Sequence, residues 1–417
     1  MKLVPIPPEK YNDYRLTAMF DCYKWDPQFE DHNTIAKHAL ILSQKEYQEL
    51  KQLTEDMDRE TRAAEEFLNM HPKCAKPLTL SSKLRREIAS MKNYNPEKHI
   101  RLMRYDFHPV EEGGWAVSEV NSDVPGGFAE ASLLPIAAKE AIGDNTLWFD
   151  NFGEIITKAI VQKVKAGGTI AMVHCTCYSD DRQVMQYLGD RLAKEGFNVI
   201  QCAADHIRFI DRNASYNKPE SYTAVSVLGE SSSDIDAIIR FNPLEWVKDI
   251  KPKYWSEFFC TETVSCNHPI ALFAQTKKFP FVWNTLEQNG ISMSTWRKLL
   301  PHTTTVQKAK GKDGYIYKPV YGRVGENIGI REACSDKEYR KILREVKLFP
   351  HKYLAQKRFN SKPLIDEAGH EYHVCLGSYT VDGKHAGFYA RVSETPRIDS
   401  NAADIPVLIE GSLKNEQ

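Results

Sequence analysis

The alternation of apolar and polar residues predicts a β-hairpin in the first third of the chain. Leu102–His108 and Trp115–Asn121 both alternate with a period of two residues, and the polar segment 110–114 between them supplies a turn. Alternate side chains of a strand share a face. The polar residues expected to share a face in this hairpin are Arg104, Asp106, His108, Glu119, Asn121 and Asp123.

A register that pairs Asp106 with Glu119 would set two like charges opposite each other. The same register places Arg104 opposite Asn121, and the two carboxylates would lie within about 5.5 Å of each other. Like charges at that distance destabilise a sheet unless a cation lies between them. Two carboxylates and an amide oxygen suit Mg²⁺, which shares hard ligands with substrate phosphates. The pattern therefore predicts a magnesium site, with a solvated hairpin face that holds no ligand as the alternative.

Helical periodicity predicts a long amphipathic helix before the hairpin. Ser43 and Glu46 form the S-x-x-E pattern of a capping box, and apolar residues return at helical spacing until His71. A further helix is expected to start at Phe128, after a glycine turn. Residues 1–40 have no clean period, so we expect this segment to wrap around a larger body.

The middle of the chain predicts a parallel α/β layer. Residues 169–174 and 197–203 have the pattern of strands, with a helix over 181–195 between them, and 236–241 has the pattern of another strand. The glycine pair beside the first strand precedes it instead of following it, so the phosphate-binding fingerprint of dinucleotide-binding folds is not present. We expect this layer to serve as scaffold or substrate wall.

The last third of the chain carries a candidate phosphate site. Tyr315–Val320 alternates as a strand that includes Lys318, and a flexible loop follows. The loop residues of interest are Gly322, Arg323 and Gly325. A strand lysine beside glycines can hold nucleotide phosphates, although no G-K-[ST] follows and the loop is not a Walker loop. The alternative is an ordinary hairpin turn. Further strands are expected at 353–356, 372–381 and 386–392.

Length and composition limit the class of protein. At 417 residues the chain is too long for a single core and suggests two or three domains. A net charge of −1 argues against nucleic-acid or membrane binding through bulk charge, and no apolar run reaches the roughly 20 residues of a membrane span. Nine cysteines without framework spacing fit a reducing compartment. We therefore expect a cytoplasmic protein without nucleic-acid or membrane partners.

Several motifs occur in the order found in a known family. Arg104–Phe107 matches an R-x-D-F strand, and Glu119–Asp123 matches an E-x-N-x-D strand that is followed by an acidic helix residue, Glu130. The other matching segments are Pro243–Trp246, Gln275–Lys277, Lys318–Pro319, Gly322–Gly325, Tyr353–Gln356 and the run Val381–Arg391. From residue 101 onwards, the chain thus resembles the glutathionylspermidine synthetase-type, circularly permuted ATP-grasp ligases.

The resemblance implies a fold and its division into domains. The fold would be mixed α/β, a circularly permuted ATP-grasp with a small parallel pre-ATP-grasp layer and a helical N-terminal segment. Residues 1–150 would hold the N-terminal helical segment and the hairpin, 151–245 the pre-ATP-grasp domain, and 246–417 the nucleotide-binding domain. Val124 and Gly126 depart from the family, since many members carry small hydroxyl residues there on the peptide-substrate side. The resemblance therefore leaves the carboxylate substrate open.

The resemblance also implies a role for each site residue. The implied Mg²⁺ ligands are Asp106, Glu119 and Asn121. The implied ATP-binding residues are Lys277, Lys318, Gly322, Arg323, Gly325 and Gln356, with Lys278 as an alternative to Lys277. The implied catalytic residues, which would contact the transferred phosphoryl group, are Arg104 and Arg391.

The function implied by the resemblance is ATP-dependent amide-bond formation through an acyl phosphate. Its substrates would be a peptide or small carboxylate and an amine such as a polyamine or an amino acid, with ATP and Mg²⁺ as cofactors. Such a ligase must bring the carboxylate in line with the γ-phosphate, so positioning and charge stabilisation carry the catalysis. Two alternatives remain open. One is an ATP-dependent phosphotransferase, for which His108 is the nearby candidate base, and the other is a nucleotide-binding protein of the same fold without turnover.

Overall fold

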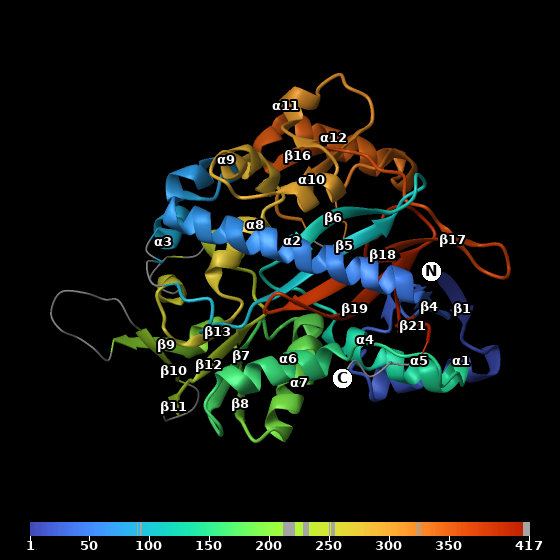
Figure 1. Cartoon of the computed structure of the whole chain (residues 1–417), viewed down its shortest axis with the longest axis horizontal. Helices are drawn as coiled ribbons and strands as arrows, with labels where there is room; N and C mark the ends of the chain where they lie inside the picture. The colour runs from blue at the N-terminus through green and yellow to red at the C-terminus, as the bar shows by residue number, and fades with distance from the viewer. Residues whose placement is uncertain are drawn as a thin grey trace.

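The computed structural model is a mixed α/β structure, as the sequence predicts. The residues that it describes are 1–89, 91, 94–211, 222–227, 233–249, 251, 255–322, 325 and 327–411. Figure 1 shows helix α2 (Gln44–Met70) lying across the front of the largest sheet, with a parallel sheet below it and a smaller lobe above.

The largest sheet is antiparallel and contains the predicted hairpin. Its strand order is β20-β19-β18-β5-β6, with β17 paired to β18. The strands are β5 (Leu102–Pro109), β6 (Trp115–Asn121), β17 (Leu364–Ile365), β18 (Glu371–Val381), β19 (Lys384–Ser393) and β20 (Ala403–Ile405). The hairpin and the two long late strands are confirmed. Because β18 pairs directly with β5, the end of the chain contributes to the same surface as the hairpin.

Helix α2 covers one face of this sheet. Its predicted capping box is present, with Ser43 accepting from the Glu46 backbone N–H and the Glu46 carboxylate accepting from the Ser43 backbone N–H. Leu50 and Met57 of the helix and Tyr105 of β5 belong to one buried core. Since the odd-numbered side chains of β5 enter this core, the even-numbered ones face the opposite side of the sheet.

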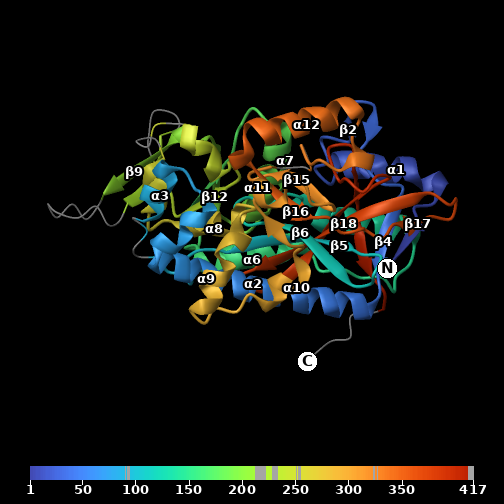
Figure 2. The ribbon, with the colours of Figure 1, turned by 90° about the horizontal axis from the view of Figure 1, so that it is seen from above.

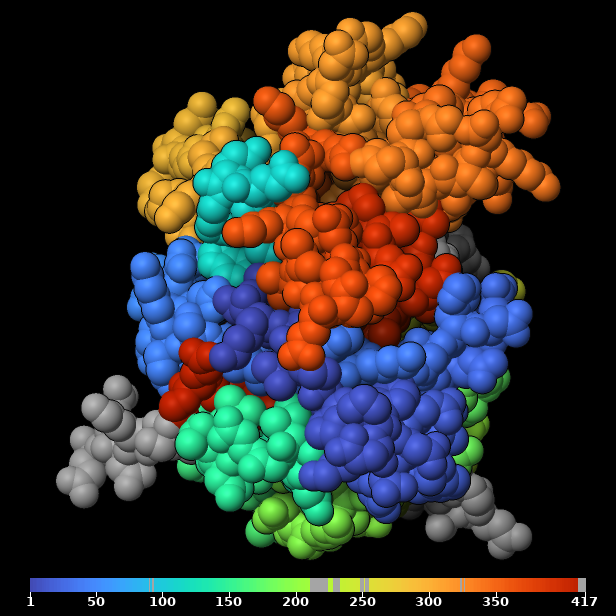
Figure 3. Space-filling view, turned by 90° about the vertical axis from the view of Figure 1, so that its right-hand side faces the viewer, coloured from blue at the N-terminus to red at the C-terminus, as the bar shows by residue number. Residues whose placement is uncertain are grey.

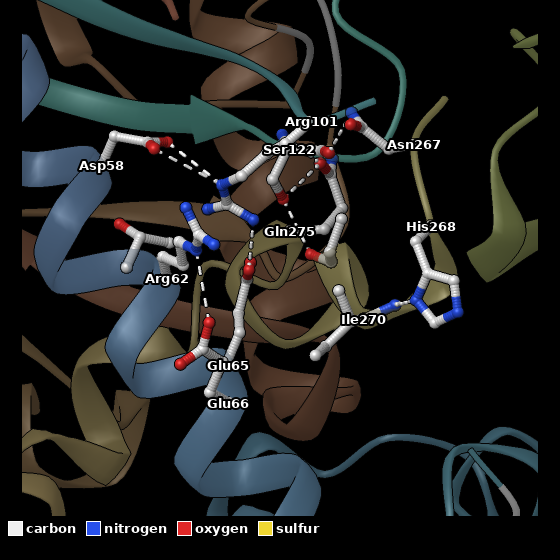
Figure 4. Close-up of polar contacts among 12 residues, drawn as sticks. Asp58, Arg62, Glu65, Glu66, Arg101, Ser122, Asn267, His268, Ile270 and Gln275 are labelled. Atoms are coloured by element: carbon white, nitrogen blue, oxygen red, sulfur yellow. Dashed lines mark hydrogen bonds and ion pairs between the residues drawn. The ribbon is translucent and has the colours of Figure 1, made fainter. Parts of the chain in front are cut away.

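A buried ion cluster joins α2 to the start of β5 (Figure 4). The Arg101 Nε donates to Asp58 at 3.3 Å, and its Nη1 donates to Glu65. Burial raises the pKa of Glu65 to about 7, although Arg101 opposes the shift. Among the described residues, Glu65 Oε1 has no hydrogen-bond partner. This cluster lies on the core side of the sheet.

The predicted parallel layer is a four-stranded sheet of order β13-β12-β7-β8. Its strands are β7 (Thr169–Val173), β8 (Asn198–Cys202), β12 (Ala237–Arg240) and β13 (Val264–Cys266). Helices α6 (Phe152–Lys163) and α7 (Ser179–Lys194) share its buried core. A small antiparallel sheet extends from it, formed by β9 (Ile207–Asp211), β10 (Tyr222–Ser226) and β11 (Ser233–Asp234).

The upper lobe contains a sheet of order β14-β16-β15 above the hairpin (Figures 1 and 2), in which β15 and β16 correspond to two of the predicted strands. Its strands are β14 (Thr303–Thr304), β15 (Tyr315–Pro319) and β16 (Tyr353–Lys357). Helix α12 (Asp336–Leu348), capped by Ser335, packs against β16. Further helices of the chain include α3 (Ser82–Ile88), α8 (Leu272–Gln275), α9 (Trp283–Gln288), α10 (Ser294–Leu299) and α11 (Val306–Ala309).

The N-terminal segment contains elements that the sequence did not predict. They are β1 (Lys2–Pro5), α1 (Pro8–Phe20), β2 (Gln28–Phe29), β3 (His32–Asn33) and β4 (His38–Leu42). β4 lies between β1 and β21 (Val407–Ile409), antiparallel to the first and parallel to the second. Figure 3 shows the first residues, in dark blue, between C-terminal residues in red and orange and residues in green. β4 was missed because a strand buried on both faces does not alternate.

The predicted helix that starts at Phe128 is divided in two. Helix α4 (Phe128–Ser132) ends at Leu133, and α5 (Leu134–Ile142) follows directly. Pro135 lies in the first turn of α5, and because it has no backbone N–H it cannot donate to the carbonyl of residue 131. The break leaves a short helix, α4, immediately after the hairpin.

The predicted domain boundaries are not visible as separate sheets. The first predicted segment, 1–150, shares the β1-β4-β21 sheet and the largest sheet with the third, 246–417. The division into three domains and the circular permutation remain predictions. In the part of the chain that the structure describes, no helix has both the length and the apolar character needed to cross a membrane.

Candidate active site

A cleft of about 1060 Å³ lies between the largest sheet, the upper lobe and the N-terminal segment. Its lining includes the sequence-predicted residues Arg104, Asp106, Glu119, Asn121, Lys318, Gly325 and Arg391. A small cavity beside it is lined by Lys277 and Gln356 together with Glu119 and Lys318. The predicted ATP-binding residue Arg323 lies outside the described residues.

The hairpin has the predicted register. Asp106 pairs with Glu119 and Arg104 pairs with Asn121. One feature was not predicted: Phe107 pairs with Val117, so Ser118 is an extra residue in a β-bulge. The bulge turns both Ser118 and Glu119 towards the cleft, while Val117 enters the core. No sequence pattern marks the bulge, because the alternation around it looks regular.

Arg104 and Asp106 form a two-point ion pair at the floor of the cleft. The distances are 2.8 Å from Arg104 Nε to Asp106 Oδ1 and 3.1 Å from Nη2 to Oδ2. The Arg104 guanidinium also donates to the Gly126 carbonyl at 2.9 Å and lies 5.0 Å from the centre of the Tyr389 ring. A side chain at Gly377 on β18 would meet Arg104, since its Cβ would lie 2.6 Å from Arg104 Cδ. A glycine at 377 therefore makes room for the arginine.

Glu119 pairs with a lysine from a different part of the chain. The Lys277 Nζ lies 2.7 Å from Glu119 Oε2 and donates to the Gly322 carbonyl at 2.8 Å. Burial opposes ionisation of Glu119, but Lys277, Lys318 and Arg104 outweigh burial and lower its pKa. The Lys278 Nζ instead donates to Thr79 at 2.6 Å. The geometry therefore brings Lys277, and not Lys278, to the hairpin carboxylates.

The hairpin side chains fit a hard cation that is also held by a substrate. The Asn121 Nδ2 donates to Asp106 Oδ2 at 2.9 Å, so the three predicted ligands lie together. Burial raises the pKa of Asp106, with Arg104 opposing and Glu119 adding to the shift. Among the described residues, no three His, Cys, Asp or Glu side chains group around one point. Two carboxylates and one amide match Mg²⁺, which takes its other ligands from water and phosphates.

Lys318 and Gln356 share a buried face of the β15–β16 pair. Lys318 pairs with Leu354 and Ile316 pairs with Gln356, so these four side chains alternate onto one face. The Lys318 Nζ contacts the Ser118 carbonyl at 3.4 Å, and burial lowers its pKa to about 8. Among the described residues, the buried Gln356 Oε1 has no hydrogen-bond partner. Gln356 Oε1 is thus free to accept from a ligand, and Lys318, with one long contact to a backbone carbonyl, can donate to one as well.

Gly325 packs against a C-terminal loop at the cleft. Gly325 has a φ of +66°, and a Cβ there would lie 2.1 Å from the Ile398 carbonyl oxygen, so only glycine fits. Close by, the Arg397 Nη1 donates to Glu338 of α12 at 2.6 Å. Gly325 and Ile398 therefore meet at the lining of the cleft. Gly322 does not line the cleft; its carbonyl accepts from Lys277, which lines the small cavity beside it.

Arg391 lines the cleft but is already engaged by the protein. Its Nη2 donates to the carbonyls of Asp399 and Ala402, at 2.7 and 3.0 Å. Across the sheet it pairs with Asp404 on one side and Cys375 on the other. Its guanidinium therefore fixes the 399–402 loop besides facing the cleft.

The other end of the cleft carries a cluster that the sequence did not reveal. The buried Lys24 Nζ lies 2.7 Å from Asp404, 2.8 Å from Asp26 and 3.5 Å from Glu130. Burial opposes the charge of Lys24, but the three carboxylates outweigh it and raise its pKa. Lys24 also lowers the pKa of Asp404 against the effect of burial. The segments that meet here are remote in sequence, which is why no motif marks the cluster.

The mouth of this end is acidic and aromatic. Asp180 and Asp181, in the first turn of α7, line the cleft. The exposed aromatic side chains that line it are Trp25, Phe29, Tyr178 and Trp246. Acidic groups beside aromatic rings suit an ammonium group better than an anion.

Comparison with known proteins agrees with this fold. A solved structure described as a glutathione synthetase-like effector from Globodera pallida, in its apo form, matches with a TM-score of 0.63 at 12% identity, covering 96% of this chain and 97% of that one. A structure described as "Putative gamma-glutamylcysteine synthetase" from Methylobacillus flagellatus has a TM-score of 0.44 at 12% identity, over 85% and 87% of the two chains, a likeness too low to bear on the fold.

Sequence comparison places the chain in a family. No curated protein matches the sequence. The family model described as "Glutathionylspermidine synthase preATP-grasp" matches residues 10–410, which is nearly the whole chain. This range includes the hairpin, the upper lobe and the acidic cluster around Lys24. The chain therefore belongs to the glutathionylspermidine synthase preATP-grasp family.

Proposed function

We propose that the protein is an ATP- and Mg²⁺-dependent ligase that joins a carboxylate to an amine through an acyl phosphate. The observation that carries this proposal is one continuous cleft with two unlike ends. At one end, lysines and an arginine surround the hairpin carboxylates, which suits a metal ion and nucleotide phosphates. At the other end carboxylates predominate, which suits an ammonium group.

Each predicted residue has a role in this proposal, and for all of them except Arg323, which lies outside the described residues, contacts or a place in the cleft support that role. Asp106, Glu119 and Asn121 would hold Mg²⁺, which supplies neutralisation of phosphate charge when bound. Lys277 and Lys318 would hold the ATP phosphates. The unpaired oxygen of Gln356 would accept from an amino group of the adenine. Gly322, Gly325 and their neighbour Arg323 would form the loop that closes over the nucleotide.

The reaction would proceed in two transfers. A carboxylate oxygen of the substrate attacks the γ-phosphorus of ATP, the bond to the bridging oxygen breaks, and ADP leaves. The amine then attacks the carbonyl carbon of the acyl phosphate, and inorganic phosphate leaves. Arg104 and Arg391 line the cleft, and they would stabilise the negative charge that develops in both transfers. The loops that meet at Gly325 would keep water from the acyl phosphate.

The family description suggests the first substrates to test. Its printed name combines glutathione with spermidine, and the Globodera pallida protein is described as glutathione synthetase-like. Val124 and Gly126, which replace small hydroxyl residues found in many members, favour a different carboxylate. We therefore propose a peptide or another small carboxylate together with a polyamine or an amino acid.

A substrate screen with product analysis tests the proposal. The purified protein is incubated with Mg²⁺ and ATP and with pairs of carboxylates (glutathione, dipeptides, free amino acids) and amines (spermidine, diamines, amino acids). The expected result is ADP, phosphate and an amide in equal amounts. A stable phosphorylated product without phosphate release would replace the ligase by a phosphotransferase. ATP binding without ADP formation across the panel would leave a nucleotide-binding protein without turnover.

A further inference from the structure

Glu130 occupies a place between the hairpin and the acidic cluster. It is the third residue of α4, the short helix that follows the hairpin, and it lines the cleft. Its side chain is only 7% exposed. A carboxylate so deeply buried normally has both oxygens satisfied by hydrogen bonds or ion pairs.

Only one of the two Glu130 oxygens is satisfied. Oε1 accepts from the Gln183 amide at 3.2 Å and lies 3.5 Å from the Lys24 ammonium. Oε2 is buried and, among the described residues, has no hydrogen-bond partner. An unpaired buried acceptor costs free energy that a donor on a ligand would recover. Contacts to Oε1 thus fix the position of the carboxylate, while Oε2 is available to accept a hydrogen bond from a ligand.

The surroundings of Glu130 leave it able to take up a proton. Burial raises its pKa to about 7, with Lys24 opposing and with Asp404 and Asp26 adding to the shift. Among the described residues, the charge of Glu130 also acts on Tyr379, Tyr389 and Cys22, whose pKa values are raised chiefly by burial, so they stay neutral near pH 7. Near neutral pH, Glu130 can therefore exchange a proton without help from another charged group.

The chemistry of amide formation needs such a group. An alkylamine has a pKa near that of lysine, about 10.4, so it arrives as an ammonium ion whose nitrogen has no lone pair to attack with. Resting on the proposed ligase function, we propose that Glu130 accepts the proton of the substrate ammonium and so frees the amine for attack on the acyl phosphate. The N–H bond breaks and its proton passes to Oε2, the C–N bond forms, the C–O bond to phosphate breaks, and phosphate carries away the electron pair. The second proton of the new amide nitrogen leaves with phosphate or water.

Two other titratable groups of the cleft, Asp404 and His108, are less suited to this step. Asp404 is engaged by Lys24 and by the Tyr389 hydroxyl at 2.7 Å, and its pKa is lowered. His108 lies at the hairpin end, and burial lowers its pKa to about 4, which makes it a weak base. Glu130 therefore combines a free acceptor atom with a place at the acidic end.

The test compares two nucleophiles in the variant Glu130→Gln. Glutamine keeps the size and the hydrogen-bonding oxygen but cannot accept a proton. With the amine identified in the substrate screen, we expect the variant to lose about 10²- to 10⁴-fold in amide formation at pH 7. With hydroxylamine, which is largely unprotonated at neutral pH, we expect hydroxamate formation within about threefold of the wild-type rate, because no proton has to be removed before attack.

The pH dependence supplies a second readout. In the wild-type protein, amide formation should rise with pH as Glu130 ionises and level off above about pH 7. In Glu130→Gln the rise should move to the higher pH at which the amine itself loses its proton. A merely structural role would lower the rate for both nucleophiles at every pH.

Glu65→Gln is a matched control. Glu65 is likewise buried, has an unpaired oxygen and has a pKa raised to about 7, but it lies in the core cluster with Arg101. We expect this substitution to change the melting temperature while leaving the pH profile and the ratio of amide to hydroxamate unchanged.

The outcomes separate the two proposals. Loss of the amide with hydroxamate retained supports the role of Glu130. Equal loss of both products, or wild-type rates of both, overturns that role while the ligase function stands. If the wild-type protein forms neither product with any carboxylate of the screen, the ligase function fails and the role of Glu130 fails with it.

Discussion

The two ends of the cleft differ in the charges of the side chains that line them. At the hairpin end, Asp106 and Glu119 are each paired with a cation, and Lys318 is buried beside them. At the acidic end, Lys24 contacts three carboxylates, of which only Asp404 is also paired with Arg391, at 3.7 Å, among the described residues. The first end has cationic groups to offer to an anion, and the second has carboxylate oxygens to offer to a cation. A reaction between a phosphorylated carboxylate and an ammonium needs both.

The ends also differ in how the chain builds them. The hairpin end depends on two strands joined by a short turn, whose geometry fixes Asp106 opposite Glu119. The acidic end joins the loop after α1, the first turn of α4 and strand β20. Local geometry therefore determines the carboxylates of the first end, whereas tertiary packing brings Lys277 to them and builds the whole of the second end. Substitutions should therefore distinguish the two ends. Changes at the hairpin end should affect the binding or use of ATP, and changes at the acidic end should affect the binding or use of the amine.

The largest effect is expected from Glu119→Gln. The substitution removes a proposed metal ligand and the partner of Lys277, so Mg²⁺-dependent ADP release should fall by about 10³-fold. ADP release under saturating ATP measures it. Glu371→Gln, an exposed glutamate on β18 outside the cleft lining, is the control and should keep the wild-type rate. Turnover within tenfold of wild type would remove Glu119 from the metal site.

Arg391→Ala should have the next largest effect, because this residue lies between the two ends. Losing one charged donor commonly costs about 10²- to 10³-fold in turnover, and ATP binding should remain nearly intact. The carbonyls of Asp399 and Ala402 also lose their donor, so the melting temperature should fall. Amide formation and ATP affinity are measured side by side. A loss of ATP affinity as large as the loss of amide formation would show that Arg391 binds the nucleotide instead.

Lys318→Met should separate ligand binding from stability. Loss of a charge-assisted contact to phosphate should weaken ATP binding by about 10- to 100-fold. In the folded protein, burial lowers the pKa of Lys318 to about 8. Between pH 8 and the higher pKa that Lys318 has in the unfolded chain, the unfolded chain binds more protons than the folded protein. The free energy of unfolding therefore rises with pH in this range. Below pH 8 the buried ammonium of Lys318 lowers the free energy of unfolding by an amount on the order of 1–3 kcal/mol. The Lys318→Met substitution removes this charge and should therefore raise the melting temperature of the protein without ligand.

Two measurements check Lys318→Met, isothermal titration with ATP and thermal unfolding from pH 6 to 10. The variant should lose the rise in stability between pH 8 and 10. A variant that is strongly destabilised at pH 7 would make Lys318 a structural residue and would weaken the argument for a phosphate site.

The smallest effect is expected from the double variant Asp180→Asn, Asp181→Asn. These carboxylates lie at the mouth of the acidic end, Asp180 is exposed, and salt screens such charges. The KM for a cationic amine should rise by about three- to tenfold, less so at high salt, with kcat unchanged. The KM for uncharged hydroxylamine serves as the control. A matching rise for hydroxylamine would show that the variant disturbs the cleft and not the charge.

The hairpin end was predictable because strand geometry is local. Period-two alternation and a short turn are enough to place Asp106 opposite Glu119 and Arg104 opposite Asn121. The bulge at Ser118 was not predictable, because an extra residue in one strand shows only against its partner. The roles of these residues still await experiment.

The acidic end could not be predicted from the sequence because its residues form no local pattern. Lys24 follows α1 in a segment without periodicity, and Asp404 lies on a three-residue strand. Glu130 was noted only as an acidic helix residue, and its importance depends on an oxygen left unpaired by the fold. The carbonyl partners of Arg391 were likewise hidden, since backbone contacts leave no mark in a sequence.

The central position of β4 sets the order in which a functional protein can arise during synthesis. β4 needs β21 as its parallel partner, and Lys24 needs Asp404 on the neighbouring stretch of chain. Translation delivers β4 and Lys24 long before these partners. Until β20 and β21 have been made, Lys24 and the unpaired edge of β4 belong to an incomplete structure that exposes apolar surface. The nascent chain thus has a long interval in which chaperones can bind it, and the cleft acquires its acidic end only once Asp404 has been made.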